Sequence, residues 1–426
     1  MKKIISILSL LVMVSSGASA QWYLFPLEKE KQKEQKKSEE KQAQPEATVP
    51  AKELEAPVTV SAETEDGFLQ ISENPEAEAD SCEVYSLDIP EEINLAMLLP
   101  IRTTGKTSSN FLEMYAGGLL ALRDLGREGL KVNLSIFDCA DEEKLITEEV
   151  LERNDVIIGP VASEDILGIL SRCPDRKRLV SPLDPKAESL ADSCNVIQAP
   201  SSGEAQVDGM LDWVREEFVP GDDLVLVKDT AETAFSEQTL YLLSKLEESG
   251  LKYKTSYLAS GITPSAIGTT RYLVASDRDG YIATAVRQIG LAAVRNRAGS
   301  SCVYLTSKMR NAKGVDQQYL YKAGAKVSMS YFTDYDDQAV KDFILSYRAL
   351  FKDEPASFAF QGYDTVKYFV EACSKYGRQW YMKLPEAGLY KGLQSNFEFH
   401  ETDGTGQANK AVKRVIYNPD MSTTIQ

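Results

Sequence analysis

Short, almost continuously apolar runs alternate with amphipathic stretches along the chain from residue 93 onward. In the amphipathic stretches apolar residues recur at helical spacing, as Phe111, Met114 and Leu122 do. Strands are expected at 93–101, 132–138, 156–158, 179–182 and 196–199, and helices at 110–125, 142–151 and 163–170. Strands as apolar as these are typical of a parallel sheet that carries helices on both faces.

The same alternation starts again near residue 205. Helices are predicted at 205–218, 237–246, 282–293, 337–351 and 360–376, strands at 224–228, 253–258, 271–275, 302–305 and 327–329, and extended segments in 389–417. The pattern indicates an α/β protein with two doubly wound parallel-sheet lobes. We assign 93–202 and 333–376 to an N-terminal lobe, and 203–332 and 377–426 to a C-terminal lobe.

The N-terminus has the three parts of a secretory signal peptide. Lys2 and Lys3 precede the apolar stretch 4–14, and Ala-Ser-Ala at 18–20 supplies a small-residue cleavage site. Residues 1–20 are therefore predicted to direct export to the periplasm and to be removed. An uncleaved signal anchor is the alternative.

The negative charge of the chain is concentrated before the first predicted strand. The formal net charge is -17, of which residues 1–92 carry -10 and the remainder only -7. Because 21–92 is rich in charge and poor in large apolar residues, we expect it to be a disordered linker. The acidic balance argues against nucleic-acid binding.

The sequence lacks the residue combinations of common catalytic centres. His400 is the only histidine, which excludes metal sites built from several histidines. There is no phosphate-binding loop, nucleophile elbow or metalloprotease helix motif. We therefore predict a binding protein and not an enzyme, with no metal or cofactor.

Ligands of open parallel sheets bind at the carboxyl ends of the strands, where helix N-termini point N–H groups into the crevice. This rule and the neighbouring loops give a set of candidate ligand-binding residues: Arg102, Thr103, Ser163, Ser181, Asp184, Phe235, Asp277 and Tyr331. Arg102 would clamp a carboxylate or remain a solvated loop arginine. Ser163 would contact a ligand or only cap its helix.

The other candidates have structural alternatives as well. Asp184 would accept a hydrogen bond from a ligand or shape a turn before proline. Asp277 would contact a ligand or stay in a surface turn. Phe235 would stack on a ligand or join the core. Tyr331 would line the crevice or pack with neighbouring aromatic residues at a hinge.

None of the six cysteines is in C-x-x-C spacing. They are Cys82, Cys139, Cys173, Cys194, Cys302 and Cys373. We favour a disulfide between Cys173 and Cys194, because each would precede a strand at the same end of one sheet. Ordinary buried thiols are the alternative.

Four stretches carry a family resemblance. They read Leu98-Leu99-Pro100 with Tyr115-Ala116-Gly117-Gly118; Val156-Ile157-Ile158-Gly159-Pro160 with Ser163; Phe343, Tyr347, Phe351 and Glu354-Pro355 with Gly362-Tyr363-Asp364; and Lys391-Gly392 with Phe397-Glu398-Phe399 and Asp403-Gly404. Together they resemble the type I periplasmic binding proteins, the leucine/isoleucine/valine-binding group of ABC-transporter solute receptors. The resemblance covers roughly 93–417 and implies two lobes joined by three crossovers, with a ligand between them.

In that family, Ser and Thr in the loops after the third and fourth strands hold the carboxylate of an amino acid. Here Ser163 keeps one position, but Leu183-Asp184-Pro185-Lys186 replaces a small Ala-Thr pair and Phe235-Ser236 replaces an aromatic-Gly pair. The resemblance therefore implies a receptor for amino-acid transport that works with an ABC permease, with an altered clamp.

The chain also looks like envelope proteins of the Bacteroidota that couple this fold to lysin-motif, peptidoglycan-binding modules. A related fold without a transporter serves as an outer-membrane lipoprotein activator of peptidoglycan synthases. Two hypotheses follow. The first is a periplasmic receptor for a small polar ligand, an amino acid or a peptide-like molecule. The second is a non-transport cell-envelope interaction protein in peptidoglycan synthesis or maintenance.

Overall fold

The computed structural model describes residues 88–103, 106–140, 146–192, 195–231, 234–296 and 299–426. The predicted signal peptide and nearly all of the predicted linker lie outside these residues. Within the unit 86–426, the described strands form two seven-stranded sheets and two short ribbons.

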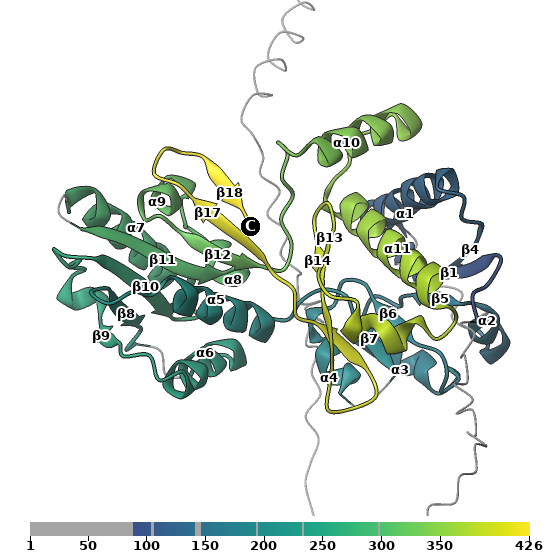
Figure 1. Cartoon of the computed structure of the whole chain (residues 1–426), viewed down its shortest axis with the longest axis horizontal. Helices are drawn as coiled ribbons and strands as arrows, with labels where there is room; N and C mark the ends of the chain where they lie inside the picture. The colour runs from purple at the N-terminus through teal and green to yellow at the C-terminus, as the bar shows by residue number, and fades with distance from the viewer. Residues whose placement is uncertain (1–87, 104–105, 141–145, 193–194, 232–233, 297–298) are drawn as a thin grey trace, which may run out of the picture. The chain divides into compact units, whose positions relative to one another are not determined.

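The first sheet contains the strands predicted in the first half of the pattern (Figure 1). In spatial order they are β15 (Phe399–Glu401), β16 (Gln407–Asn409), β7 (Val196–Gln198), β6 (Leu179–Ser181), β5 (Val156–Ile158), β1 (Ile93–Leu99) and β4 (Val132–Asp138). All neighbours run parallel except β15 and β16. The predicted parallel sheet is confirmed.

Both faces of the first sheet are buried. The helices of this lobe are α1 (Ser109–Arg127), α2 (Glu148–Arg153), α3 (Ser163–Leu170), α4 (Glu188–Ala191), α10 (Gln338–Phe351) and α11 (Ser357–Tyr376). Leu95 and Met97 of β1 pack in one cluster with residues of α1 and α11, whereas Ala96 and Leu98 pack in another with residues of α3. Burial on both sides explains why β1 is an uninterrupted apolar run.

The second sheet repeats this plan. Its strands, in spatial order, are β18 (Thr423–Ile425), β17 (Lys413–Tyr417), β12 (Lys326–Met329), β11 (Ser300–Thr306), β10 (Thr269–Ala275), β8 (Asp223–Lys228) and β9 (Lys254–Ser256). Only β17 runs antiparallel to its neighbours. The helices are α5 (Gly203–Glu217), α6 (Glu237–Glu248), α7 (Asp279–Arg295), α8 (Ser307–Arg310) and α9 (Gln317–Lys322).

The chain passes between the sheets three times: between β7 and α5, between β12 and α10, and between β16 and β17. The structure differs from the predicted lobe boundary after α11. Residues 377–409 stay with the first lobe, because β16 pairs with β7 and η4 (Trp380–Glu386) packs on α11. Strands β13 (Tyr390–Lys391), β14 (Asn396–Phe397), β15 and β16 have two or three residues each, too few for a periodic signal.

Helices α1 and α11 approach until their backbones touch. A Cβ atom on Gly117 would lie 1.9 Å from the carbonyl oxygen of Ala359. One on Gly362 would lie 2.0 Å from the carbonyl oxygen of Met114. These reciprocal contacts explain why both helices need glycine at the crossing.

The turn 392–395 contacts two of the three crossovers. The backbone N–H of Phe332 donates to the carbonyl of Gln394 over 2.9 Å, and Tyr331 forms an isolated β-bridge with Ser395. Lys413 Nζ, at the start of β17, donates to the Gly392 and Leu393 carbonyls, each over 3.2 Å. The turn therefore lies where the chain leaves and re-enters the second lobe.

Asp364 of α11 holds this turn. Its buried carboxylate accepts backbone N–H bonds from Leu393 and Gln394 over 2.8 Å each and from Ser395 over 2.9 Å. Burial raises the pKa of Asp364 to about 6, although the three N–H groups and the charge of Lys413 act to lower it. One side chain thus fixes three consecutive peptide groups.

Gly117→Ala should destabilise the protein by about 3 kcal/mol, because the new methyl group would meet backbone that cannot move aside alone. Gly126→Ala in the same helix is the matched control, since no atom lies within 4 Å of its added Cβ. The control should gain about 0.5–1 kcal/mol from helix propensity. Chemical denaturation measures both, and equal effects of the two variants would contradict the close helix contact.

Asp364→Asn should cost about 2–4 kcal/mol, because an amide NH2 would replace an acceptor in front of a buried N–H donor. Asp342→Asn, on the exposed side of α10, should stay within about 0.5 kcal/mol of the wild type. Denaturant midpoints measured at pH 7 compare the two. A neutral result for Asp364→Asn would show that the turn is held by other contacts.

Candidate functional site

Aspartates stand at or just after the carboxyl ends of strands in both sheets. Asp138 is the last residue of β4, Asp184 follows β6, Asp229 follows β8 and Asp277 follows β10. Each carboxylate accepts hydrogen bonds from its own lobe. The edges where a ligand of this fold class would bind are therefore built from paired groups.

Arg102 lies in the short ribbon of β2 (Arg102–Thr103) and β3 (Lys106–Thr107), and its Nε donates to Asp138 Oδ2 over 3.0 Å. The backbone N–H groups of Ile101 and Arg102 donate to the same carboxylate. Burial alone would raise the pKa of Asp138, but these donors outweigh it and lower the pKa. The Arg102 side chain remains 52% exposed, so its guanidinium is oriented by the protein and open to solvent.

Asp184 closes the N-terminus of α3. The Ser163 hydroxyl donates to Asp184 Oδ2 over 2.5 Å, and the Ser163 backbone N–H donates to the same oxygen over 3.2 Å. The other oxygen, Oδ1, accepts the backbone N–H of Lys186 over 2.9 Å. Two predicted ligand residues thus contact each other.

Asp277 closes the N-terminus of α6 in the same manner. The N-cap residue Ser236 donates its backbone N–H to Asp277 Oδ2 over 2.7 Å and its hydroxyl to Oδ1 over 2.5 Å. Thr239 Oγ1 and Lys308 Nζ also donate to Oδ1, over 3.1 and 2.5 Å. Burial alone would raise the pKa of Asp277, but Lys308 and Ser236 lower it from 3.8 to about 2.

These two aspartate–serine contacts have the same local form at different positions in the two lobes, because in the spatial order of the strands β10 corresponds to β5 and β8 corresponds to β1. In each lobe a strand leads to a helix with serine at its start, and an aspartate follows the adjacent parallel strand: β5, α3 and β6 in one lobe, β8, α6 and β10 in the other. Sequence reasoning selected Ser163, Asp184 and Asp277 but treated Ser236 only as a departure from a family motif. An N-cap serine with threonine three residues later was the signal available for it.

Asp229 and Arg278 form an ion pair that the sequence did not reveal. Arg278 Nε and Nη2 donate to the two oxygens of Asp229 over 2.7 and 2.6 Å, and Ser276 Oγ donates over 2.8 Å. Asp229 is buried, whereas the Arg278 side chain is 49% exposed. Arg278 follows the candidate Asp277 directly, but its partner lies 49 residues away along the chain.

The remaining candidates have less polar contact. Ser181 is fully buried, and its hydroxyl has no hydrogen-bond partner within the described part of the chain. Phe235 is half-buried, with Lys228 Nζ 6.0 Å from its ring centroid. Tyr331 is 38% exposed beside the turn 392–395. Thr103 lies in β2, and its side chain is outside the described residues.

The predicted disulfide stays a prediction, because Cys194 lies outside the described residues. Cys173 is half-buried after α3. The described ranges contain no group of three or more His, Cys, Asp and Glu residues that could hold a metal ion. They also contain no helix long and apolar enough to cross a membrane.

Comparison with solved structures identifies the architecture. A Rhodospirillum rubrum protein described as a branched-chain amino acid ABC transporter aligns over 79% of this chain and 100% of its own, with 13% identity and a TM-score of 0.53. Full-length LpoA from Haemophilus influenzae aligns over 80% of this chain and 60% of its own, with 11% identity and a TM-score of 0.50. The chain has the type I periplasmic binding protein fold.

The type I fold is thus the extent of what these likenesses establish. A substrate-binding protein from Desulfitobacterium hafniense in complex with Leu also aligns, over 79% of this chain and 100% of its own, at 14% identity and a TM-score of 0.46. No family model and no curated protein matches the sequence. The similarity to envelope proteins with lysin motifs stays a prediction.

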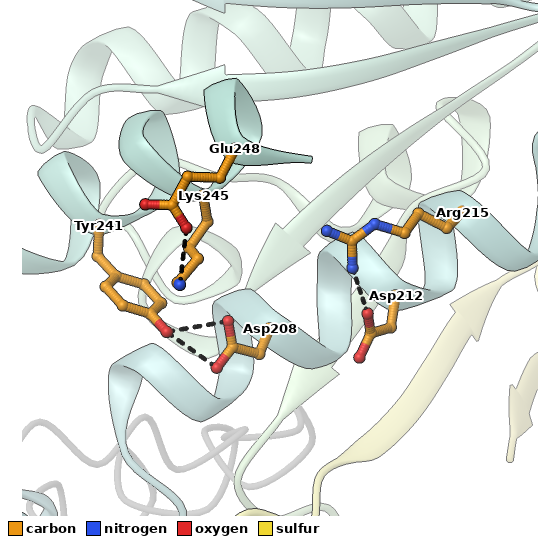
Figure 2. A pocket seen from close by; sticks show the side chains of 6 residues that line it. All are labelled: Asp208, Asp212, Arg215, Tyr241, Lys245 and Glu248. Carbon is orange, nitrogen blue, oxygen red and sulfur yellow. Dashed lines mark hydrogen bonds and ion pairs between the residues drawn. The ribbon is translucent and has the colours of Figure 1, made fainter. Parts of the chain in front are cut away.

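A groove of about 440 Å³ lies along α5 and α6 of this type I fold (Figure 2). It is lined by Asp208, Asp212, Arg215, Tyr241, Lys245 and Glu248, none of which is a predicted ligand residue. Lys245 pairs with Glu248, Arg215 pairs with Asp212, and the Tyr241 hydroxyl donates to Asp208. Because each of the six side chains has a polar partner within this set, the groove is a solvated seam between two helices.

Asp277→Asn should remove acid sensitivity at the α6 closure. A carboxylate whose pKa falls from 3.8 to about 2 on folding contributes stability that is present above pH 4 and lost as the pH falls through 2. The wild type should therefore lose about 2 kcal/mol more than Asp277→Asn between pH 5 and pH 2. Denaturation at each pH measures this, with exposed Asp279→Asn as the control. Parallel loss in wild type and Asp277→Asn would contradict the assignment.

Proposed function

We propose that the chain is an exported ligand-binding receptor that holds a small polar ligand, an amino acid or a peptide-like molecule, between its two lobes. The observation that carries this proposal is the type I fold with oriented polar side chains at the carboxyl ends of both sheets. Open parallel sheets bind their ligands at that edge. The signal-like residues 1–20 support export to the periplasm.

The polar groups at these edges are suited to holding a ligand. Arg102 of the first lobe is 52% exposed, and Arg278 and Lys308 of the second lobe are each 49% exposed. Each is oriented by a carboxylate that is at most 15% exposed, so its position is set before any ligand arrives. Donors that are oriented in advance lose little entropy when a ligand binds. The half-buried ring of Phe235 adds apolar surface.

Binding fits these residues better than catalysis does. The four aspartates are occupied by ion pairs or helix caps, and the single histidine, His400, lies exposed on the edge strand β15. A general base needs a partner poised toward a substrate, and none of these groups has that arrangement. We propose an ABC permease as the partner that reads lobe closure.

A thermal-shift screen of amino acids, their amides and peptidoglycan fragments tests the receptor. A true ligand should raise the melting temperature with the logarithm of its concentration, following RT ln(1+[L]/Kd). Phe235→Ala should weaken that response at least tenfold in Kd, about 1.4 kcal/mol. Leu240→Ala, 53% exposed on α6, should leave it unchanged. Absence of any saturable shift across the panel would count against the receptor.

The second candidate is a cell-envelope interaction protein without transport. Two observations favour it: the N-termini of α3 and α6 are already filled by carboxylates of the chain, and LpoA shares the fold at a TM-score of 0.50. Pull-down with purified peptidoglycan and with peptidoglycan synthases separates the candidates. Specific capture together with a silent ligand screen would support this second function.

A further inference from the structure

We propose that Asp184 and Asp277 are built-in occupants of the helix N-termini of α3 and α6, and that they keep free carboxylates out of the crevice. On the receptor function proposed above, the ligand is then an oxygen-bearing molecule without a free carboxylate, such as an amide, a peptide with a blocked C-terminus or a carbohydrate. Both aspartates are specificity-determining residues for this receptor.

The first occupant uses the donors that a ligand carboxylate would need. A helix N-terminus attracts a carboxylate through its dipole and its unpaired N–H groups. At α3 the hydroxyl and the backbone N–H of Ser163 both donate to Asp184, over 2.5 and 3.2 Å. A second carboxylate would have to share these donors and would lie within a few ångströms of a like charge, which is unfavourable.

The second occupant is held by more donors still. Ser236 N–H, Ser236 Oγ, Thr239 Oγ1 and Lys308 Nζ converge on Asp277, whose side chain is only 15% exposed. The same serine–aspartate closure in both lobes gives two independent instances of one arrangement. Each lobe would therefore reject a free carboxylate at one helix N-terminus, α3 in the first and α6 in the second.

Two buried polar atoms near Asp184 support the same conclusion. Ser181 Oγ and Gln198 Oε1 are cross-strand neighbours at the ends of β6 and β7, and both side chains are fully buried. Neither atom has a hydrogen-bond partner in the described ranges. Gln198 Nε2 donates to the Pro185 carbonyl over 2.6 Å. This hydrogen bond holds the segment that carries Asp184 next to the same pair of strand ends. A buried polar atom without a partner raises the free energy of the folded state. The ends of β6 and β7 are therefore a polar position that residues of the chain itself cover.

The groups that remain exposed suit neutral oxygen acceptors. Arg102 and Arg278 each pair with a buried carboxylate, so each pair carries no net charge. The two arginine side chains are nevertheless 52% and 49% exposed. They can orient a carbonyl or hydroxyl oxygen of a ligand. Because each arginine is paired with a carboxylate, they lack the long-range attraction that an unpaired cation exerts on an anion.

Chemical rescue tests this proposal on the full chain. Asp184→Ala and Asp277→Ala each remove one carboxylate and leave its hydrogen-bond donors without an acceptor, which added acetate can supply. Their melting temperatures should fall and then rise with the logarithm of acetate concentration. Acetamide, and chloride at matched ionic strength, should give no such rise. The wild type should respond alike to acetate and chloride.

Matched controls separate occupancy from general charge. Glu164→Ala and Glu237→Ala remove exposed carboxylates from the first turns of the same two helices without touching either closure. Neither control should gain a response to acetate. Stabilisation of either control by acetate would overturn the proposal. So would stabilisation of Asp184→Ala and Asp277→Ala by acetamide as strong as that by acetate.

A measurement on the wild type keeps the proposal testable even where an Ala variant does not fold. Leucine and leucinamide, and other acid–amide pairs, are compared by thermal shift and calorimetry. Binding of the amide in preference to the acid supports the proposal, and binding of the acid in preference overturns it while leaving the receptor intact. If acetate stabilises the Asp variants but no ligand binds the wild type, the roles of Asp184 and Asp277 at the helix N-termini are supported. The proposed receptor function is then contradicted.

Discussion

The carboxylate of Asp364 is the contact on which the two-lobed architecture depends. It accepts hydrogen bonds from three consecutive backbone N–H groups of the turn 392–395. The same turn is hydrogen-bonded to Phe332 and Lys413 in two of the crossovers. A buried carboxylate is stable only when its oxygens are satisfied, so the turn and the aspartate stabilise each other. Without that anchor, two of the three connections between the sheets would lose a fixed point of departure.

The strand-end aspartates follow the same principle at the crevice edges. Asp138 and Asp229 pair with arginines, whereas Asp184 and Asp277 pair with serines at helix starts. Each of the four carboxylates accepts hydrogen bonds from several donors of its own lobe. The chemistry of these edges is thus already arranged before any ligand arrives.

Much of the fold could be predicted, because buried parallel strands and amphipathic helices leave periodic signals. Strand β4 begins and ends where the pattern placed it, and α3 does too. The extended segments predicted in 389–417 contain the short strands β13 to β16, but two or three residues carry no period that assigns a strand to a sheet. The pattern therefore assigns 377–426 to the C-terminal lobe, whereas β15 and β16 pair within the first sheet.

The site was harder, because its geometry depends on distant pairs. Asp184 and Ser163 were each selected, but their contact spans 21 residues, and Ser236 meets Asp277 across 41. Nothing in the sequence marks Asp229 as a site residue, because its partner Arg278 lies 49 residues further along the chain. Residue type and strand position can mark a candidate, whereas its partner comes only from the packing of adjacent strands.

The glycine crossing of α1 and α11 has a mechanical consequence. Gly362 lies two residues before Asp364 on the same helix, so the backbone contact and the turn anchor share one rigid segment. Any bending at the connections would therefore leave α1 and α11 stationary relative to each other. This helix pair is a natural reference frame: a probe attached to α1 would report no internal displacement while the connections flex.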